Sequence, residues 1–261
     1  MEALARAIRP GGVEWRDLRV LSASERAREL VLGTPWLAAS LILAQRRLWP
    51  AALACSFYFF LCGLRRAHDA FHAAAGLGRK GSDVQLFLLS VAMGGSLHAV
   101  RWNHLRHHRF CLGAGDVEGG AARGSAWRAL LDGPRFPLQL HVAAWRSGSR
   151  RVRSWMAAEL AAGAALIAVA VGVPACPALR YHVLVMSAGQ CLTAFFAVWT
   201  VHHGVGRGAR TVRGALRARA FYHMFFHLEH HLYPAVPARH LPRLAARLDR
   251  AAPGLPLPRV L

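Results

Sequence analysis

The chain has 261 residues, 54% of them hydrophobic, and its 33 lysine and arginine residues against 13 aspartate and glutamate residues give a net charge of +20. In a soluble protein such a charge is typical of nucleic-acid binding, yet no nucleic-acid-binding motif is present and the apolar residues form long blocks. The composition therefore excludes a nucleic-acid-binding protein and predicts an integral membrane protein whose spans have basic flanks.

Apolar blocks that suit the hydrocarbon core, which takes about 20 residues to cross, occur at four places in the chain. Between the second and third blocks, residues 85–100 are apolar but are interrupted by Gly94 and Gly95, which predicts a re-entrant or interfacial segment. The predicted transmembrane helices, of which the first is marginal in length, cover residues 30–44, 48–64, 155–173 and 181–200.

Basic residues are distributed unevenly around these spans. Thirty of the 33 lie in residues 1–29, 65–154 and 201–261, and the others lie in the short connections within two predicted helical hairpins. Because lysine and arginine gather on the cytoplasmic side, these segments and both termini are predicted to be cytoplasmic, in a membrane of the bacterial inner type. The predicted fold is a single all-α integral membrane domain, residues 1–261, with about four transmembrane helices in two hairpins and a cytoplasmic histidine-rich cap.

The last predicted helix, at about residues 240–251, is amphipathic. Leu241, Leu244 and Leu248 recur at helical spacing with arginines between them. Such a helix can lie on a membrane surface or pack its leucines on the protein core, and the sequence leaves both alternatives open.

Histidines are concentrated just beyond the ends of the predicted spans, in groups that fall on the predicted cytoplasmic face. Residues at i, i+3 and i+4 share one face of a helix, so each group presents its imidazoles side by side. One such group is more often accidental than functional, but three in succession indicate a metal site. Neutral imidazole binds iron, zinc, copper and nickel, and eight ligands exceed the four of a tetrahedral zinc site, which predicts two metal ions. The eight are His68, His72, His104, His107, His108, His227, His230 and His231.

Several histidines lie outside these groups. His203 is the best candidate for a ninth ligand, with His202 close behind, and His223 can serve as a ligand or support one. Motifs of an intramembrane zinc protease, a carboxylate-bridged di-iron bundle and a dinucleotide-binding fold are absent, so the histidine groups stand alone as the candidate site. The histidines predicted to be packed or interfacial are His98, His141, His182 and His240.

The segments "HDAFH" from His68, "HLRHH" from His104 and "HLEHHLYPAVPARHLPRL" from His227 resemble the three histidine boxes of the membrane-bound fatty acid desaturase family. Relatives of that family include fatty acyl hydroxylases and carotenoid ketolases and hydroxylases. The resemblance covers the chain from about Arg65 onward and is most specific after the third box, where leucines and prolines continue the pattern. The segment "GAGDVEG", residues 113–119, resembles the acidic turn that often follows the second box.

The resemblance implies a centre of two iron ions that activates dioxygen with electrons from an external donor, such as a ferredoxin or a small haem cytochrome. The implied ligands and catalytic residues are the eight box histidines, with His203 as a ninth ligand. His223 departs from the pattern, since relatives often carry asparagine there. The implied reaction is desaturation of a fatty acyl chain, and the alternative is hydroxylation or ketone formation on acyl lipids or carotenoids. A non-catalytic metal-binding or transport membrane protein is the alternative from a different class.

The arginine surplus has two interpretations. It would steer an acidic electron carrier to the site, or it would contact anionic lipid head groups.

Overall fold

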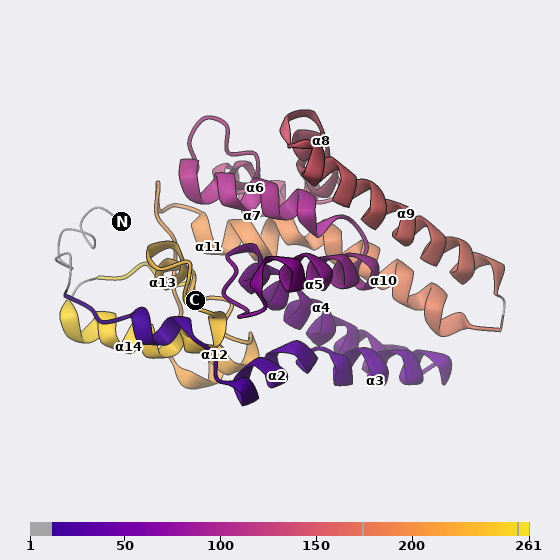
Figure 1. The fold of residues 1–261 in the computed structure, drawn as a ribbon, viewed down its shortest axis with the longest axis horizontal. Coiled ribbons are helices and arrows are strands. Elements are labelled where there is room, and N and C mark those ends of the chain that lie inside the picture. Colours follow the sequence, from indigo (N-terminus) through magenta and orange to yellow (C-terminus); the bar gives the residue numbers. More distant parts are fainter. Residues whose placement is uncertain (1–11, 174, 255, 261) are drawn as a thin grey trace.

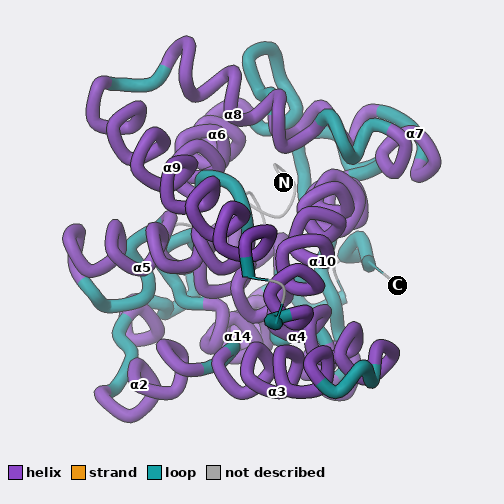
Figure 2. Tube along the Cα trace, turned by 90° about the vertical axis from the view of Figure 1, so that its right-hand side faces the viewer, coloured by secondary structure: helices purple, strands orange, loops and turns teal. Residues whose placement is uncertain are grey.

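The computed structural model describes residues 12–173, 175–254 and 256–260. In these ranges the chain is built from helices joined by turns and loops, and it has no strand beyond an isolated bridge between Thr211 and Arg259 (Figure 1, Figure 2). The predicted all-α class is confirmed.

Long helices form the body of the protein and short ones carry the turns near the histidines. The helices of nine residues or more are α2 (Ala23–Val31), α3 (Thr34–Gln45), α4 (Trp49–Phe71), α5 (Gly78–Met93), α6 (Leu97–Phe110), α8 (Phe136–Ser147), α9 (Arg150–Gly172), α10 (Pro177–Thr193) and α14 (Leu241–Ala251). The shorter ones are η1 (Arg16–Arg19), η2 (Glu118–Arg123), α7 (Ala126–Leu131), η3 (Ala194–Trp199), α11 (Thr200–His202), α12 (Ala215–Ala220), α13 (His227–Leu232) and η4 (Ala238–His240). Five helices, α3, α4, α8, α10 and α14, begin with a proline in the first turn, where its missing N–H leaves no hydrogen bond unmade.

Candidate membrane spans occur in the same regions as three of the predicted ones. Helices α5 and α6 are together long and apolar enough to cross a membrane as one bent unit, which would give a fourth span. Helix α4 covers residues 49–64 of the predicted span 48–64 but is not among the candidate spans; Arg65 and Arg66 directly follow its apolar part. The pairing of the spans into hairpins stays a prediction. In the described part of the chain, the unbroken candidates are Ala23–Gln45, Arg150–Gly172 and Pro177–His202.

The segment predicted to be re-entrant is a sharp bend. Helices α5 and α6 meet at an angle of 113°. Gly94 and Gly95 occupy the break with φ of 75° and 108°, a backbone region that favours glycine. The carboxylate of Glu159, on α9, accepts a hydrogen bond of 2.7 Å from Ser90 Oγ and another from Ser96 Oγ, so buried polar contacts hold both sides of the bend. This bend sets the direction in which α6 carries its histidines.

The connections α3–α4 and α9–α10 lie at one end of the molecule, and α12, α13 and α14 gather at the other (Figure 1). Leu241, Leu244 and Leu248 of α14 are 2%, 0% and 5% exposed and pack in one cluster with Val13 and Leu18. Burying each leucine contributes about 1.5–3 kcal/mol. The leucine face of α14 is therefore packed on the protein core, the second of the two alternatives, and is not free to lie on a membrane surface.

Candidate metal centre

The three histidine boxes lie on the ends of three separate helices. His68 is in the last turn of α4 and His72 directly follows that helix. The second box, which begins with His104, lies in the last two turns of α6, and the third fills α13 from His227 onward. The three segments are far apart in the chain, but these helix ends bring their histidines together.

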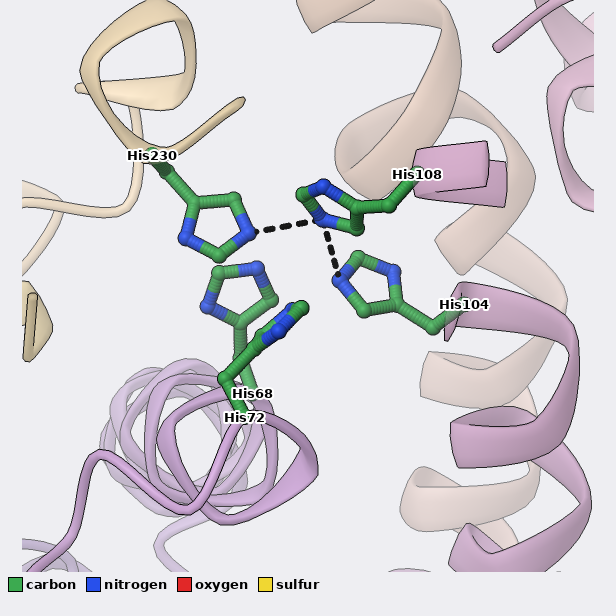
Figure 3. A group of neighbouring side chains, drawn as sticks. All are labelled: His68, His72, His104, His108 and His230. Atoms are coloured by element: carbon green, nitrogen blue, oxygen red, sulfur yellow. Dashed lines mark hydrogen bonds between the residues drawn. The ribbon is translucent and has the colours of Figure 1, made fainter. Parts of the chain in front are cut away.

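The structure brings all eight box histidines into two adjacent groups, together with His202. Within each group, one ring nitrogen of every residue lies within 4.8 Å of the others. Figure 3 shows the first group, with rings from all three boxes pointing toward one another. The groups adjoin where the rings of His108 and His231 stack with centroids 4.3 Å apart. The first group is His68, His72, His104, His108 and His230, and the second is His107, His202, His227 and His231.

The nitrogen spacings fit metal coordination. In the first group, Nε2 of His108 lies 3.1 Å from Nε2 of His104 and 2.9 Å from Nε2 of His230. A metal–imidazole distance of about 2.1 Å places two ligands at right angles about 3.0 Å apart. Nε2 of His68 and of His72 is buried without a hydrogen-bond partner, and a buried unpartnered nitrogen costs about 1–3 kcal/mol. A bound metal ion would satisfy these atoms, so the residues present fit such a group.

The second group has the same spacing. Nε2 of His202 lies 3.0 Å from Nε2 of His107 and 2.9 Å from Nε2 of His227, and the nitrogen of His227 lies 3.1 Å from that of His231. Four converging imidazoles again fit one metal ion, so the arrangement matches two ions rather than one.

Partners on the far side of the rings fix their orientation. Nδ1 of His104 lies 2.9 Å from a carboxyl oxygen of Glu118, and Nδ1 of His107 lies 2.8 Å from one of Asp116. Nδ1 of His202 lies 2.8 Å from the carbonyl oxygen of Gly208. A histidine that donates from Nδ1 presents the lone pair of Nε2 to a metal, and such partners orient ligands in metal sites. The acidic turn after the second box therefore orients two of the candidate ligands, a role that the sequence prediction missed. The available signal was two carboxylates beside a histidine box in a very basic chain.

The electrostatics of the third box favour neutral imidazoles. Burial, followed by repulsion from neighbouring imidazoles, holds the pKa of His227, His230 and His231 well below its usual value. Neutral rings have lone pairs free for a metal. Burial also raises the pKa of Glu118 to about 7. Burial acts in the same direction on the pKa of Asp116, but hydrogen bonds from the His107 ring and from two backbone N–H groups outweigh it and lower that pKa.

The structure brings His202, rather than His203, to the other candidate ligands. His203 lies outside both groups, with Nδ1 donating to the carbonyl oxygen of Trp199 over 2.8 Å and its ring stacked on that indole at 3.8 Å. His202, the second choice, is 1% exposed and belongs to the second group. His223 also lies outside both groups, and its Nδ1 is buried without a hydrogen-bond partner.

The four histidines predicted to be packed lie outside both groups and have protein partners. His98 contacts Glu159 at 2.7 Å through Nδ1 and stacks on an indole. His141 accepts from a backbone N–H at the α5–α6 bend, and His182 and His240 each contact a backbone carbonyl oxygen at 2.8 Å.

An apolar cavity of about 270 Å³ reaches the histidines. Its walls come mainly from α4 and α10, and one histidine from each box, His68, His104 and His227, lies in its lining. Glu118 lines the same cavity, and its Oε2 atom is buried without a hydrogen-bond partner. The cavity can therefore bring a hydrocarbon group up to the candidate centre.

These features define a helical membrane protein in which two all-histidine groups, suited to a pair of metal ions, meet an apolar cavity. The sequence model of the family described as fatty acid desaturase matches residues 47–260. The chain thus belongs to the fatty acid desaturase family, as the histidine boxes predicted, and this is a family of oxidoreductases. No curated protein and no solved structure matches the chain.

Proposed function

We propose that the protein is an oxygen-dependent fatty acyl desaturase of the membrane that holds two iron ions. The observation that carries this proposal is the pair of histidine groups beside the apolar cavity. The five imidazoles of the first group exceed the four ligands of a tetrahedral zinc site and suit an ion of higher coordination number, such as iron.

In the proposed centre the ligands are the eight box histidines and His202. When bound, the iron pair would supply the oxidising power that removes hydrogen from an unactivated methylene group, with dioxygen and external electrons consumed. Asp116 and Glu118 would hold two of the ligand rings in place through hydrogen bonds to Nδ1 of His107 and His104. The apolar walls hold the substrate chain and keep water from the oxidant.

The orientation of the protein in the membrane and the source of its electrons belong to the same proposal. The concentration of basic residues in segments 1–29, 65–154 and 201–261 supports a cytoplasmic position for the histidine-rich end. An acidic carrier such as a ferredoxin would be attracted to that face.

The test is a lipid profile of cells that express the protein. Wild-type protein should add a double bond to cellular acyl chains, and His230→Ala should not, because it removes one of five imidazoles from the first group. His203→Ala is the matched control, since it is the same substitution at a histidine that lies outside both groups. Identical profiles for wild type and His230→Ala, with iron-loaded protein present, would contradict the proposal. A hydroxylated or keto product from wild type would favour the hydroxylase or ketolase alternative.

A further inference from the structure

The first histidine box contains a carboxylate that the candidate metal centre does not use. Asp69 directly follows His68 in the segment "HDAFH", yet it belongs to neither histidine group and is only 6% exposed. A buried carboxylate is unfavourable unless it is paired or hydrogen-bonded. Oδ1 of Asp69 accepts a hydrogen bond of 2.9 Å from the backbone N–H of Ala238, the first residue of η4. Asp69 therefore joins the helix of the first box to the segment that follows the third box.

Arg65, one helical turn before Asp69, contacts the segment on the other side of the third box. Its Nη1 donates to the carbonyl oxygen of Tyr222 over 3.0 Å, and its Nη2 donates to both carboxylate oxygens of Glu29 on α2 at 2.7 Å. Oε1 of this carboxylate also lies 3.4 Å from Nη1 of Arg239 in η4. Residues four apart share one face of a helix, so Arg65 and Asp69 form one stripe of α4, rotated by about 60° from the stripe of the first box.

These contacts hold the chain where it enters and leaves the third box, because Tyr222 lies shortly before the box and Ala238 shortly after it. Tyr222 and His223 have φ of 49° and 65°, a left-handed conformation that is disfavoured for residues other than glycine. Such a backbone persists only where its surroundings hold it. Arg65 supplies one of the contacts that hold this turn, so both ends of the third-box segment are attached to α4.

The third box contributes to both histidine groups, so its position affects both. His230 belongs to the first group, where its ring centroid lies 3.9 Å from that of His68 in the first box. His227 and His231 are two of the four members of the second group. Helix α13, which carries all three, has six residues, and a helix of that length is not stable on its own. Contacts outside α13 must therefore hold it where its rings meet those of the first and second boxes.

We propose that Arg65 and Asp69 are positioning residues of the metal centre. Through Tyr222 and Ala238 they hold the third box at the place where its three histidines complete both groups. This inference rests on the proposed function for the presence of the metal ions, and it adds two residues that lie outside the histidine groups. Residues that orient ligands without binding the metal affect metal affinity nearly as strongly as some ligands do, so this role can be measured without turnover.

The test compares Asp69→Ala, which removes the acceptor for the N–H of Ala238, with Asp69→Asn, which keeps an amide oxygen in its place. Asp83→Ala is the matched control, since Asp83 is another buried carboxylate that is paired within the protein, with His98, and lies outside both histidine groups. Affinity for iron(II) is measured on each purified protein by competition with a chelator. Hydrogen exchange of the α13 amides is measured on the metal-free proteins, so this second readout does not depend on a bound ion.

Asp69→Ala should lower the affinity for iron(II) about 10- to 100-fold and speed exchange in α13 about tenfold, because a hydrogen bond to a charged group is lost. Asp69→Asn should restore both values, and Asp83→Ala should lower the melting temperature while leaving both unchanged.

Arg65→Lys is a second, milder variant. It keeps a positive charge beside Glu29 but loses the fork that reaches two partners, so it should act in the same direction as Asp69→Ala. Unchanged iron affinity in Asp69→Ala and Arg65→Lys, or an equal loss in Asp83→Ala, would overturn the positioning role. Wild-type protein that binds zinc(II) but no iron(II) would instead refute the proposed iron centre, and the same competition series run with zinc(II) would then decide the positioning role.

Discussion

Replacing His202 by alanine tests the composition of the second histidine group. The ring is 1% exposed, and its Nε2 lies within 3.0 Å of nitrogens of His107 and His227, so the substitution removes one of four converging donors. Four-ligand protein sites bind a metal with about 10–16 kcal/mol, or about 3 kcal/mol for each ligand, which corresponds to about a hundredfold in affinity. The first group keeps all five donors. His202→Ala should therefore lose about half of its iron, namely that of the second group, and all of its oxidation activity.

The assay is iron per chain by mass spectrometry on purified protein, with His203→Ala as the matched neighbour. His203 lies outside both groups and stacks on Trp199, a contact worth about 0.5–1.5 kcal/mol. His203→Ala should keep its iron and lose only thermal stability. The reasoning fails if His203→Ala loses iron while His202→Ala retains it.

Three further predictions concern carboxylates. Asp116→Asn weakens the bond that orients His107 and should lower metal affinity about 10- to 100-fold, measured by chelator competition, while the melting temperature stays within a few degrees of wild type. Glu159→Ala leaves three buried donors at the α5–α6 bend without an acceptor and should destabilise the protein by about 3 kcal/mol, measured by thermal unfolding in detergent; an unchanged melting temperature would show that the bend does not depend on it. Glu25→Ala removes one half of a capping box and should cost about 1 kcal/mol, whereas Glu14→Ala at an exposed site should cost nothing measurable. Hydrogen bonds, first that of a backbone N–H and then that of a histidine, lower the pKa of Glu25 from 4.5 to about 2. Its contribution is therefore complete above pH 4.5 and is lost as the pH falls toward 2, so the difference in stability between wild type and Glu25→Ala should shrink in that window.

The sequence alone predicted the helical class, the regions of the candidate spans and the family, because these depend on long apolar blocks and on histidine spacing. Gly94 and Gly95 also marked the bend, because two consecutive glycines weaken a helix and favour a change of direction. Which carboxylate pairs with which candidate ligand could not be predicted, although the acidic turn itself is visible in the sequence. Asp116 and Glu118 reach their histidines through a loop whose path depends on packing against other segments, and no periodicity in the sequence reports that path.

Regular helical spacing cannot predict which of the adjacent residues His202 and His203 points into the protein. A straight α-helix that keeps Met186 on its buried face returns to that face every 3.6 residues, near positions 200 and 204, so His202 would point away from the protein interior. The π-helix Ala194–Trp199 holds about one extra residue in its turn, which delays the buried face by about 100°. Val198, 2% exposed, follows this delayed register, and one turn later the delay brings His202 inward and leaves His203 on the surface of the neighbouring indole. The backbone irregularity that selects between the two adjacent histidines leaves no periodic signal in the sequence, so it can be read only from the folded chain.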